Sequence, residues 1–176
     1  MHPSLQALFN QLEVRRKTTL EPFRSFSPEQ LNHRPRPNQW SVAEVLSHLI
    51  TAEQLSVAYL TKKMQGVDDL PRTGLIEELK MGLLIISQRL PGLKFKAPKR
   101  VVDSTTVLTS WHEIEGAWNA VRKDLYALLE HLPPNGMDRK IYRHPMAGYL
   151  NIRHTLVFFR EHLIHHGPQL RRLLNP

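Results

Sequence analysis

The sequence predicts an all-α fold, a four-helix bundle with an extra helix and a basic loop inserted between the bundle helices. Long segments in which apolar residues recur every three or four positions alternate with proline-rich joints, the pattern of packed helices. Only 8 glycines and few stretches of alternating apolar and polar residues argue against a sheet. A length of 176 residues fits one domain, so we expect residues 1–176 to form a single helical bundle.

The helix boundaries follow from prolines, glycines and capping residues. The strongest signal opens the second long helix, where Ser41 and Glu44 have the spacing of a capping box. Trp40 and Val45, around the same start, have the spacing of a hydrophobic staple. Asn151 is the expected N-cap of the last helix. The expected long helices are about 4–23, 41–63, 75–90, 109–131 and 152–174.

Composition limits the chemistry and the compartment. The chain has no cysteine, which excludes disulfides, thiolate metal ligands and cysteine nucleophiles, so any reacting thiol must belong to another molecule. Its longest strictly apolar run, 83–86, is far shorter than the ~20 residues of a membrane span. The first residues lack the pattern of a signal peptide. We therefore expect a cytoplasmic protein without a membrane partner.

Two histidines of the last helix share one side of it. Successive helical residues turn by about 100°, and His162 and His166, four positions apart, stand one above the other on a shoulder of the apolar arc. The same helical wheel places four polar residues on the opposite side, toward water: His154, Glu161, His165 and Arg172.

His48 lies on a comparable shoulder of the second long helix. Three imidazoles from two helices could hold one face of a divalent metal and leave positions for water or substrate. Imidazole suits zinc, nickel, copper and iron. The chain has 10 histidines, however, and a His-x-x-x-His pair also arises by chance. Spacing alone leaves open that these are partly buried histidines bonded to backbone or carboxylate groups.

Other polar and aromatic residues have simpler expected roles. Glu53 falls inside the apolar arc of its helix, where a hydrogen bond that joins helices is favoured over a role in orienting a metal ligand. Gln169 is expected to line the site as a polar residue, and His144 to shape a turn rather than bind metal. We expect the three tryptophans to anchor the core: Trp40, Trp111 and Trp118.

The net charge of +8 raises the alternative of a nucleic-acid-binding module. A basic loop at 91–108 could contact phosphate through Lys94, Lys96, Lys99 and Arg100. Basic residues are scattered over all segments, however, and no recognition motif or stacking array accompanies them. A solvated loop and no nucleic-acid partner are therefore favoured.

Several segments resemble the DinB-like superfamily. The stretch 40–49, WSVAEVLSHL, is similar to that family's tryptophan-serine start and histidine-leucine pair. The stretch 144–151, HPMAGYLN, resembles its His-Pro-x-x-Gly turn, and the loop at 96–99, KAPK, also looks like a family loop. Residues 162–169 match its His-x-x-x-His-x-x-Gln helix, although Gly167 and Pro168 inside that helix depart from the pattern. The resemblance spans about residues 30–174.

The resemblance implies a four-helix bundle with a metal site on His48, His162 and His166. Members of the family include bacillithiol transferases and mycothiol-dependent maleylpyruvate isomerases, and many others have no assigned activity. The implied function is a small-thiol S-transferase or a hydrolase, with nickel or zinc, a small-molecule substrate and a low-molecular-weight thiol as cosubstrate. A homodimer is a weaker expectation, drawn from the family and from the extensive helix surface. A metal-binding protein without catalysis remains the alternative.

Overall fold

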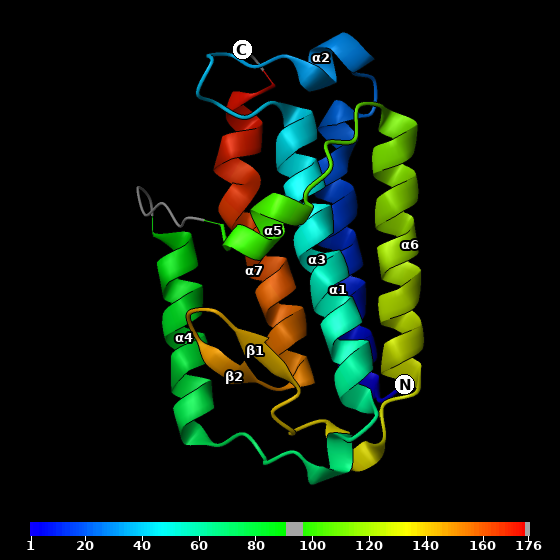
Figure 1. Ribbon diagram of the computed structural model, residues 1–176, viewed down its shortest axis with the longest axis vertical. Helices are drawn as coiled ribbons and strands as arrows, with labels where there is room; N and C mark the ends of the chain where they lie inside the picture. The colour runs from blue at the N-terminus through cyan, green and yellow to red at the C-terminus, as the bar shows by residue number, and fades with distance from the viewer. Residues whose placement is uncertain (91–96, 175–176) are drawn as a thin grey trace.

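A computed structural model describes residues 1–90 and 97–174 and confirms the all-α fold (Figure 1). Within these ranges the helices are α1 (Pro3–Leu20), α2 (Pro28–Asn32), α3 (Val42–Met64), α4 (Leu75–Arg89), α5 (Lys99–Ser104), α6 (Trp111–Glu130) and α7 (Ile152–Arg172). Short 3-10 turns lie at Glu21–Phe23, Val67–Asp69 and Pro134–Gly136. A two-stranded antiparallel sheet joins β1 (Tyr142–His144) and β2 (Gly148–Leu150).

Four long helices, α1, α3, α6 and α7, run side by side along the length of the molecule (Figure 1). Helix α3 packs against both α6 and α7, and α1 packs against α7. The predicted extra helix is α4, which lies at the edge of the bundle against α7 and the hairpin. The short helix α5 crosses α3, so the segment between α3 and α6 in the sequence contributes both added helices.

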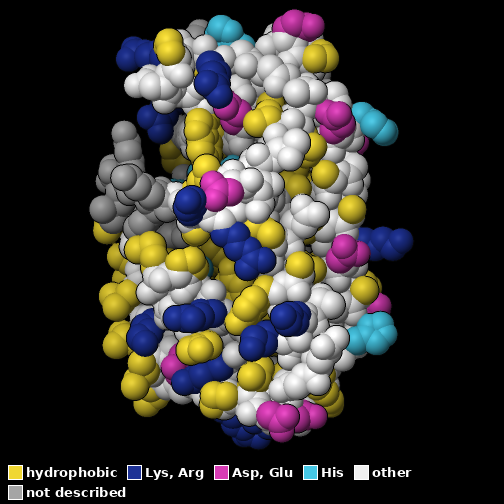
Figure 2. Space-filling model, viewed as in Figure 1, with side chains coloured by type: hydrophobic (Ala, Val, Ile, Leu, Met, Phe, Trp, Pro, Cys, Tyr) yellow, Lys and Arg dark blue, Asp and Glu magenta, His cyan; other side chains and the backbone are white. Residues whose placement is uncertain are grey.

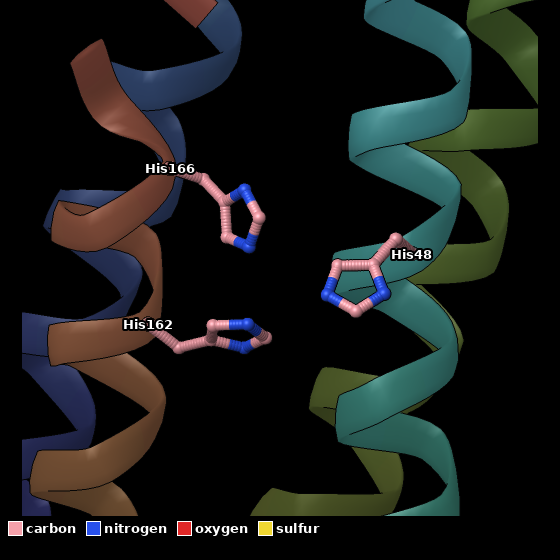
Figure 3. A group of neighbouring side chains, drawn as sticks. All are labelled: His48, His162 and His166. Atoms are coloured by element: carbon pink, nitrogen blue, oxygen red, sulfur yellow. The ribbon is translucent and has the colours of Figure 1, made fainter. Parts of the chain in front are cut away.

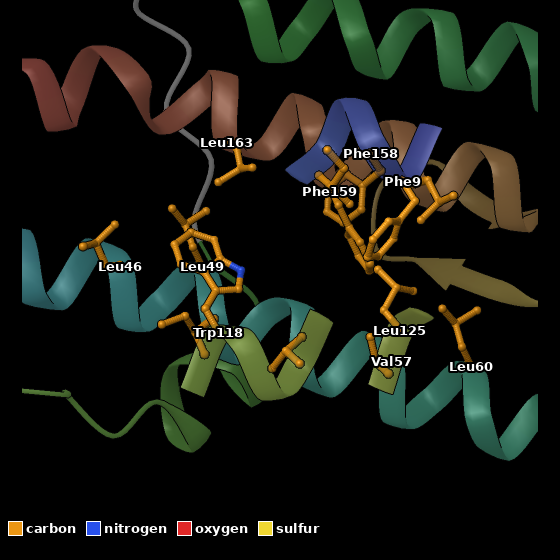
Figure 4. Close-up of a cluster of buried hydrophobic side chains, with 14 of the residues drawn as sticks. Phe9, Leu46, Leu49, Val57, Leu60, Trp118, Leu125, Phe158, Phe159 and Leu163 are labelled. Carbon is orange, nitrogen blue, oxygen red and sulfur yellow. The ribbon is translucent and has the colours of Figure 1, made fainter. Parts of the chain in front are cut away.

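Apolar side chains from all four bundle helices meet in one core (Figure 4). Phe9 of α1, Leu49 of α3, Trp118 of α6 and Phe159 of α7 are among the buried side chains. Burying a side chain of this size stabilises the fold by about 1.5–3 kcal/mol. The core therefore fixes how α3 and α7 face each other, which matters because these two helices carry the histidines.

The predicted helix starts agree with the hydrogen bonds found. The Ser41 hydroxyl accepts from the Glu44 amide at 3.2 Å, and the Glu44 carboxylate accepts from the Ser41 amide at 2.8 Å. The Asn151 side-chain oxygen accepts from the His154 amide at 2.9 Å. These caps satisfy amides that a helix start leaves without partners, and so they set where α3 and α7 begin. The position of His48 on its helix follows from the first of them.

The hairpin was missed, because the small glycine count and the lack of alternation predicted no sheet. Strands of three residues are too short for alternation to be visible in the sequence. Gly148 has a φ of +74°, in the left-handed region that glycine adopts without strain. The Nδ1 atom of His144 accepts from the amides of Met146 and Ala147, at 3.2 and 3.1 Å. This agrees with the expectation that His144 shapes a turn.

One side of α7 was assigned wrongly. His154 and Glu161 are buried rather than turned toward water. Helix α4 covers them, with the Nε and Nη2 atoms of Arg89 donating to the Glu161 carboxylate at 2.7 and 2.8 Å. The Nε2 atom of His154 lies 3.0 Å from a carboxylate oxygen of Glu78, also on α4. A helical wheel predicts one inward direction, whereas α7 packs against neighbours on two sides.

The tryptophans divide between the core and the surface. Trp118 is fully buried, and Trp111 packs against the core while partly exposed. Trp40 is 37% exposed, so the expectation that it anchors the core was wrong. It precedes α3, and its ring instead lies beside that of His48.

The predicted basic loop lies only partly within the described residues. Lys94 and Lys96 lie outside the described residues, and Lys99 and Arg100 are exposed at the start of α5. The sequence did not predict that short helix. None of the described helices is long and apolar enough to cross a membrane.

Candidate metal centre

Three histidines that are distant in the sequence converge between α3 and α7 (Figure 3). One ring nitrogen from each of His48, His162 and His166 lies within 4.8 Å of the other two. The ring centroids are 5.3 Å apart for His48 and His162, 5.2 Å for His48 and His166, and 4.9 Å for His162 and His166. Helix α7 supplies two rings because residues four apart share a side of a helix, and α3 supplies the third.

Burial differs among the three rings. His48 is 6% exposed, whereas His162 and His166 are partly exposed and so remain in contact with solvent. Aromatic rings stand beside the cluster on two sides. The Trp40 ring is 5.3 Å from the His48 ring, and the Phe158 ring stacks on His162 at 5.6 Å with an interplanar angle of 13°. The cluster therefore has apolar walls and an access to water.

The histidine side chains are uncharged at neutral pH. Burial lowers the pKa of His48 to about 4, with a further contribution from the nearby His165. Burial also lowers the pKa of His166 to about 4 and that of His162 well below its usual range. Around His162, the neighbouring imidazoles add to the effect of burial. Metal coordination requires neutral imidazole, so this cluster is ready to bind a cation without first losing protons.

Gln169 fixes the tautomer of the His166 ring. Its side-chain oxygen lies 2.9 Å from Nδ1 of His166, so an Nδ1 proton donates to it and leaves the lone pair on Nε2. Such partners commonly orient metal-binding histidines. Helix α7 continues past Gly167 and Pro168 to Arg172, so the departure from the family pattern does not interrupt this helix.

Glu53 belongs to a different buried cluster. Its carboxylate accepts from Nε1 of Trp118 and from Nη2 of Arg122, both at 2.8 Å. The Nε atom of Arg122 also lies 3.1 Å from the carboxylate of Glu13 on α1. Glu53 therefore joins α3 to α6 and, through Arg122, to α1. The contacts agree with the favoured interpretation, a hydrogen bond between helices.

Sequence reasoning missed the two aromatic walls. Phe158 lies four residues before His162 on α7, so helical spacing could have found it. Trp40 carries no such signal, because it precedes the helix and a helical wheel does not extend to it. The structure brings together the three predicted histidines with Gln169, and it places Glu53 elsewhere.

The donor set fits a divalent transition metal. The cluster offers three imidazole nitrogens, and among the described residues no carboxylate or thiolate joins them. Imidazole ligands suit zinc, nickel, copper and iron. Metal–nitrogen bonds of about 2.0–2.1 Å would require the rings to close slightly from their present separation. His162 and His166 are the freer rings to do so, because both are partly exposed.

Comparison with known proteins assigns nearly the whole chain to one family. The model of the DinB superfamily matches residues 11–170, a range that includes all three histidines. A protein of Bacillus subtilis (strain 168), named uncharacterized protein YuaE, is 27% identical over 167 residues, which cover 95% of each chain. With the helical fold and a three-histidine cluster that fits a metal-binding protein, the chain belongs to the DinB superfamily.

Proposed function

We propose that this protein is a metal-dependent enzyme that holds nickel or zinc on His48, His162 and His166. Its reaction is the transfer of a small thiol to an electrophilic substrate, or hydrolysis. One observation carries the proposal: three neutral imidazoles face one another at a solvent-accessible position between two rigid helices.

The hydrogen-bond state of the rings supports a bound cation. Within the described residues, His48 and His162 make ring contacts but no hydrogen bonds, so their ring nitrogens remain without polar partners. None of these nitrogens is among the buried polar atoms that lack a partner, so they are open to solvent. A cation can therefore reach the cluster and bind the lone pairs of the three rings.

Three protein ligands leave coordination positions open, where a bound divalent cation would lower the pKa of water or a thiol toward neutrality. Gln169 would hold His166 in the tautomer that presents Nε2 to the site. Trp40 and Phe158 would keep water from the sides of the cluster they cover. The chain has no cysteine, so the thiol would enter as a cosubstrate.

The test is an assay of thiol transfer. Purified protein is mixed with a small thiol and an electrophilic acceptor, with and without a chelator, and then with nickel or zinc restored. We expect turnover that the chelator abolishes and the metal restores, and that His162→Ala lacks. His112→Ala is the matched control, because His112 is exposed on α6. Chelator-insensitive turnover would contradict the proposal, and stoichiometric metal without turnover on thiol or hydrolytic substrates would favour a noncatalytic metal-binding protein.

A further inference from the structure

Helix α4 carries an apolar stripe on the side that faces away from the bundle. The stripe consists of Ile76, Leu79, Leu83, Ile86 and Leu90, the last being the residue that caps the helix. These residues are separated by three, four, three and four positions, the spacing of a coiled-coil seam. The opposite side of α4 is its buried side and contains Glu77, Met81, Leu84 and Gln88. The apolar stripe is therefore additional to the packing of α4 within the chain.

The stripe residues are strongly exposed. Their exposed fractions are 66% for Ile76, 67% for Leu79, 59% for Leu83, 57% for Ile86 and 50% for Leu90, and the adjoining Leu75 is 89% exposed. These six make up half of the large apolar side chains that the described residues expose. Figure 2 shows the apolar surface along α4, at the left edge of the view. On the other long helices, Val14 of α1 is the one large apolar side chain that the described residues expose, so the stripe is a property of α4.

We propose that the stripe is the interface of a homodimer in which α4 packs antiparallel against α4 of a second copy. A two-fold symmetric dimer needs one patch that is complementary to itself, and a heptad seam meets this condition because its side chains interlock with an identical seam. The exposed fractions correspond to on the order of 600 Å² of apolar surface per copy, at the upper end of the largest apolar patch on a typical monomer and near the ~800 Å² per partner of a standard interface.

The helix dipole favours the antiparallel direction. The charged residues near the ends of α4 already have partners within the chain: Glu77 pairs with Lys140, Glu78 with His154 and Arg89 with Glu161. The preference therefore comes from the backbone. About an axis that crosses the stripe near Leu83, two antiparallel helices place the positive end of each dipole beside the negative end of the other. A parallel pair would instead place like ends side by side.

Gly82 agrees with close approach of another helix. It lies beside the stripe in the interior of α4, where glycine weakens a helix relative to alanine. Among the described residues, no atom lies within 4 Å of the position that a Cβ would occupy. Packing inside the chain therefore does not require glycine here, whereas a second helix seated on the stripe would gain from its small size.

The first test measures the mass of the full-length protein by light scattering and sedimentation at about 10–200 µM. We expect a species of twice 20.5 kDa, and we expect Leu83→Glu to weaken the dimer at least tenfold because it buries two unpaired charges. Helix content and metal content should not change, since Leu83 contacts water in the single chain. Val14→Glu is the matched control, because Val14 is 65% exposed on α1 and should leave the dimer intact.

The absence of cysteine allows a second test, which also fixes the direction of the helices. Leu83→Cys should form a disulfide between copies under mild oxidation, because it lies at the proposed axis. Ile76→Cys should not, because an antiparallel pair separates its two copies by about 20 Å, far beyond disulfide reach. Crosslinking of both variants would overturn the antiparallel arrangement.

Two further outcomes would overturn the proposal. The first is a wild-type chain that stays monomeric at 200 µM, or a dimer that Leu83→Glu leaves unchanged. The second is a wild-type monomer that sediments with phosphatidylcholine and phosphatidylglycerol vesicles while Leu83→Glu does not, which would assign the stripe to a membrane surface. Neither result depends on the metal or on catalysis, so failure here leaves the proposed function standing.

Discussion

Two polar clusters share helix α3 and differ in charge, in burial and in whether their polar atoms have partners. Glu53 lies in one of them, where a tryptophan and an arginine donate to its two oxygens at 2.8 Å. His48 lies five residues earlier in the other, with two more neutral imidazoles and no opposite charge among the residues in the cluster. The first cluster pairs its carboxylate with donors from within the chain, while the second presents lone pairs that the described residues do not use.

This difference separates a structural role from a ligand-binding one. Buried charged groups in proteins are normally paired, and the Glu53 carboxylate has donors on both oxygens. A neutral imidazole has one nitrogen that donates and one that accepts, and a cation is the ligand that three accepting nitrogens recognise when they face one another. The two clusters should therefore respond differently to substitution, one in stability and the other in metal binding.

The largest expected effect is on metal binding. His48→Ala, His162→Ala and His166→Ala should each lower metal affinity by more than the 10–100-fold that removal of an outer hydrogen-bond partner costs. His165→Ala should retain metal, because His165 is not one of the three converging rings. The measurement is the metal content of each variant after dialysis against a chelator of known affinity. Equal retention of metal by all four variants would contradict the assignment of the three histidines as metal ligands.

The Glu53 cluster should respond through stability instead. Glu53→Ala leaves the buried Arg122 without its partner on α3, which should cost about 3–5 kcal/mol of unfolding free energy. Metal content per folded chain should stay unchanged. Asp124→Ala, at an exposed position on α6, is the control and should shift stability by less than about 0.5 kcal/mol. Denaturant titration gives both values, and loss of metal from folded Glu53→Ala would contradict the separation of the two clusters.

Acid should destabilise the metal-free protein. The pKa values of His48, His144 and His166 lie at about 4 in the folded chain, below the usual 6.5. The unfolded chain therefore binds more protons between these values, and stability falls as pH falls from 6.5 toward 4. We expect a loss of about 1 kcal/mol for each ring between pH 7 and 5.5. Chemical denaturation in the presence of a chelator measures it, and constant stability over this range would show that the rings titrate normally.

The smallest effect concerns Gln169. Gln169→Ala removes the oxygen that accepts from Nδ1 of His166, so metal affinity should fall by roughly tenfold, the lower end of the cost for such partners. Gln169→Glu keeps an acceptor in place and should restore most of the affinity. Competition with a chromogenic chelator would measure both variants. Unchanged affinity in Gln169→Ala would mean that packing alone orients the ring.

The sequence predicted the features that depend on helical periodicity. The starts of α3 and α7 follow from Ser41 and Asn151, and the apolar arcs placed the three histidines on shoulders of these two helices. The burial of His154 was missed, because a helical wheel assumes that a helix packs against neighbours on one side, whereas α4 covers a second side of α7. Trp40 was missed because its position depends on how the chain enters α3, and periodicity does not describe that path.

The contact between Arg89 and Glu161 also determines which surface α4 presents. Glu161 is fully buried, and both oxygens accept from Arg89, with Arg160 as a second donor to one of them. Were α4 to roll about its own axis and hide its leucines and isoleucines, Glu161 would lose Arg89 and keep only Arg160 as a charged partner in the protein interior. This ion pair, the contact of Glu78 with His154 and the buried Met81 and Leu84 together hold the orientation of α4. The apolar stripe therefore stays exposed for as long as α7 stays folded, whether or not a partner is present.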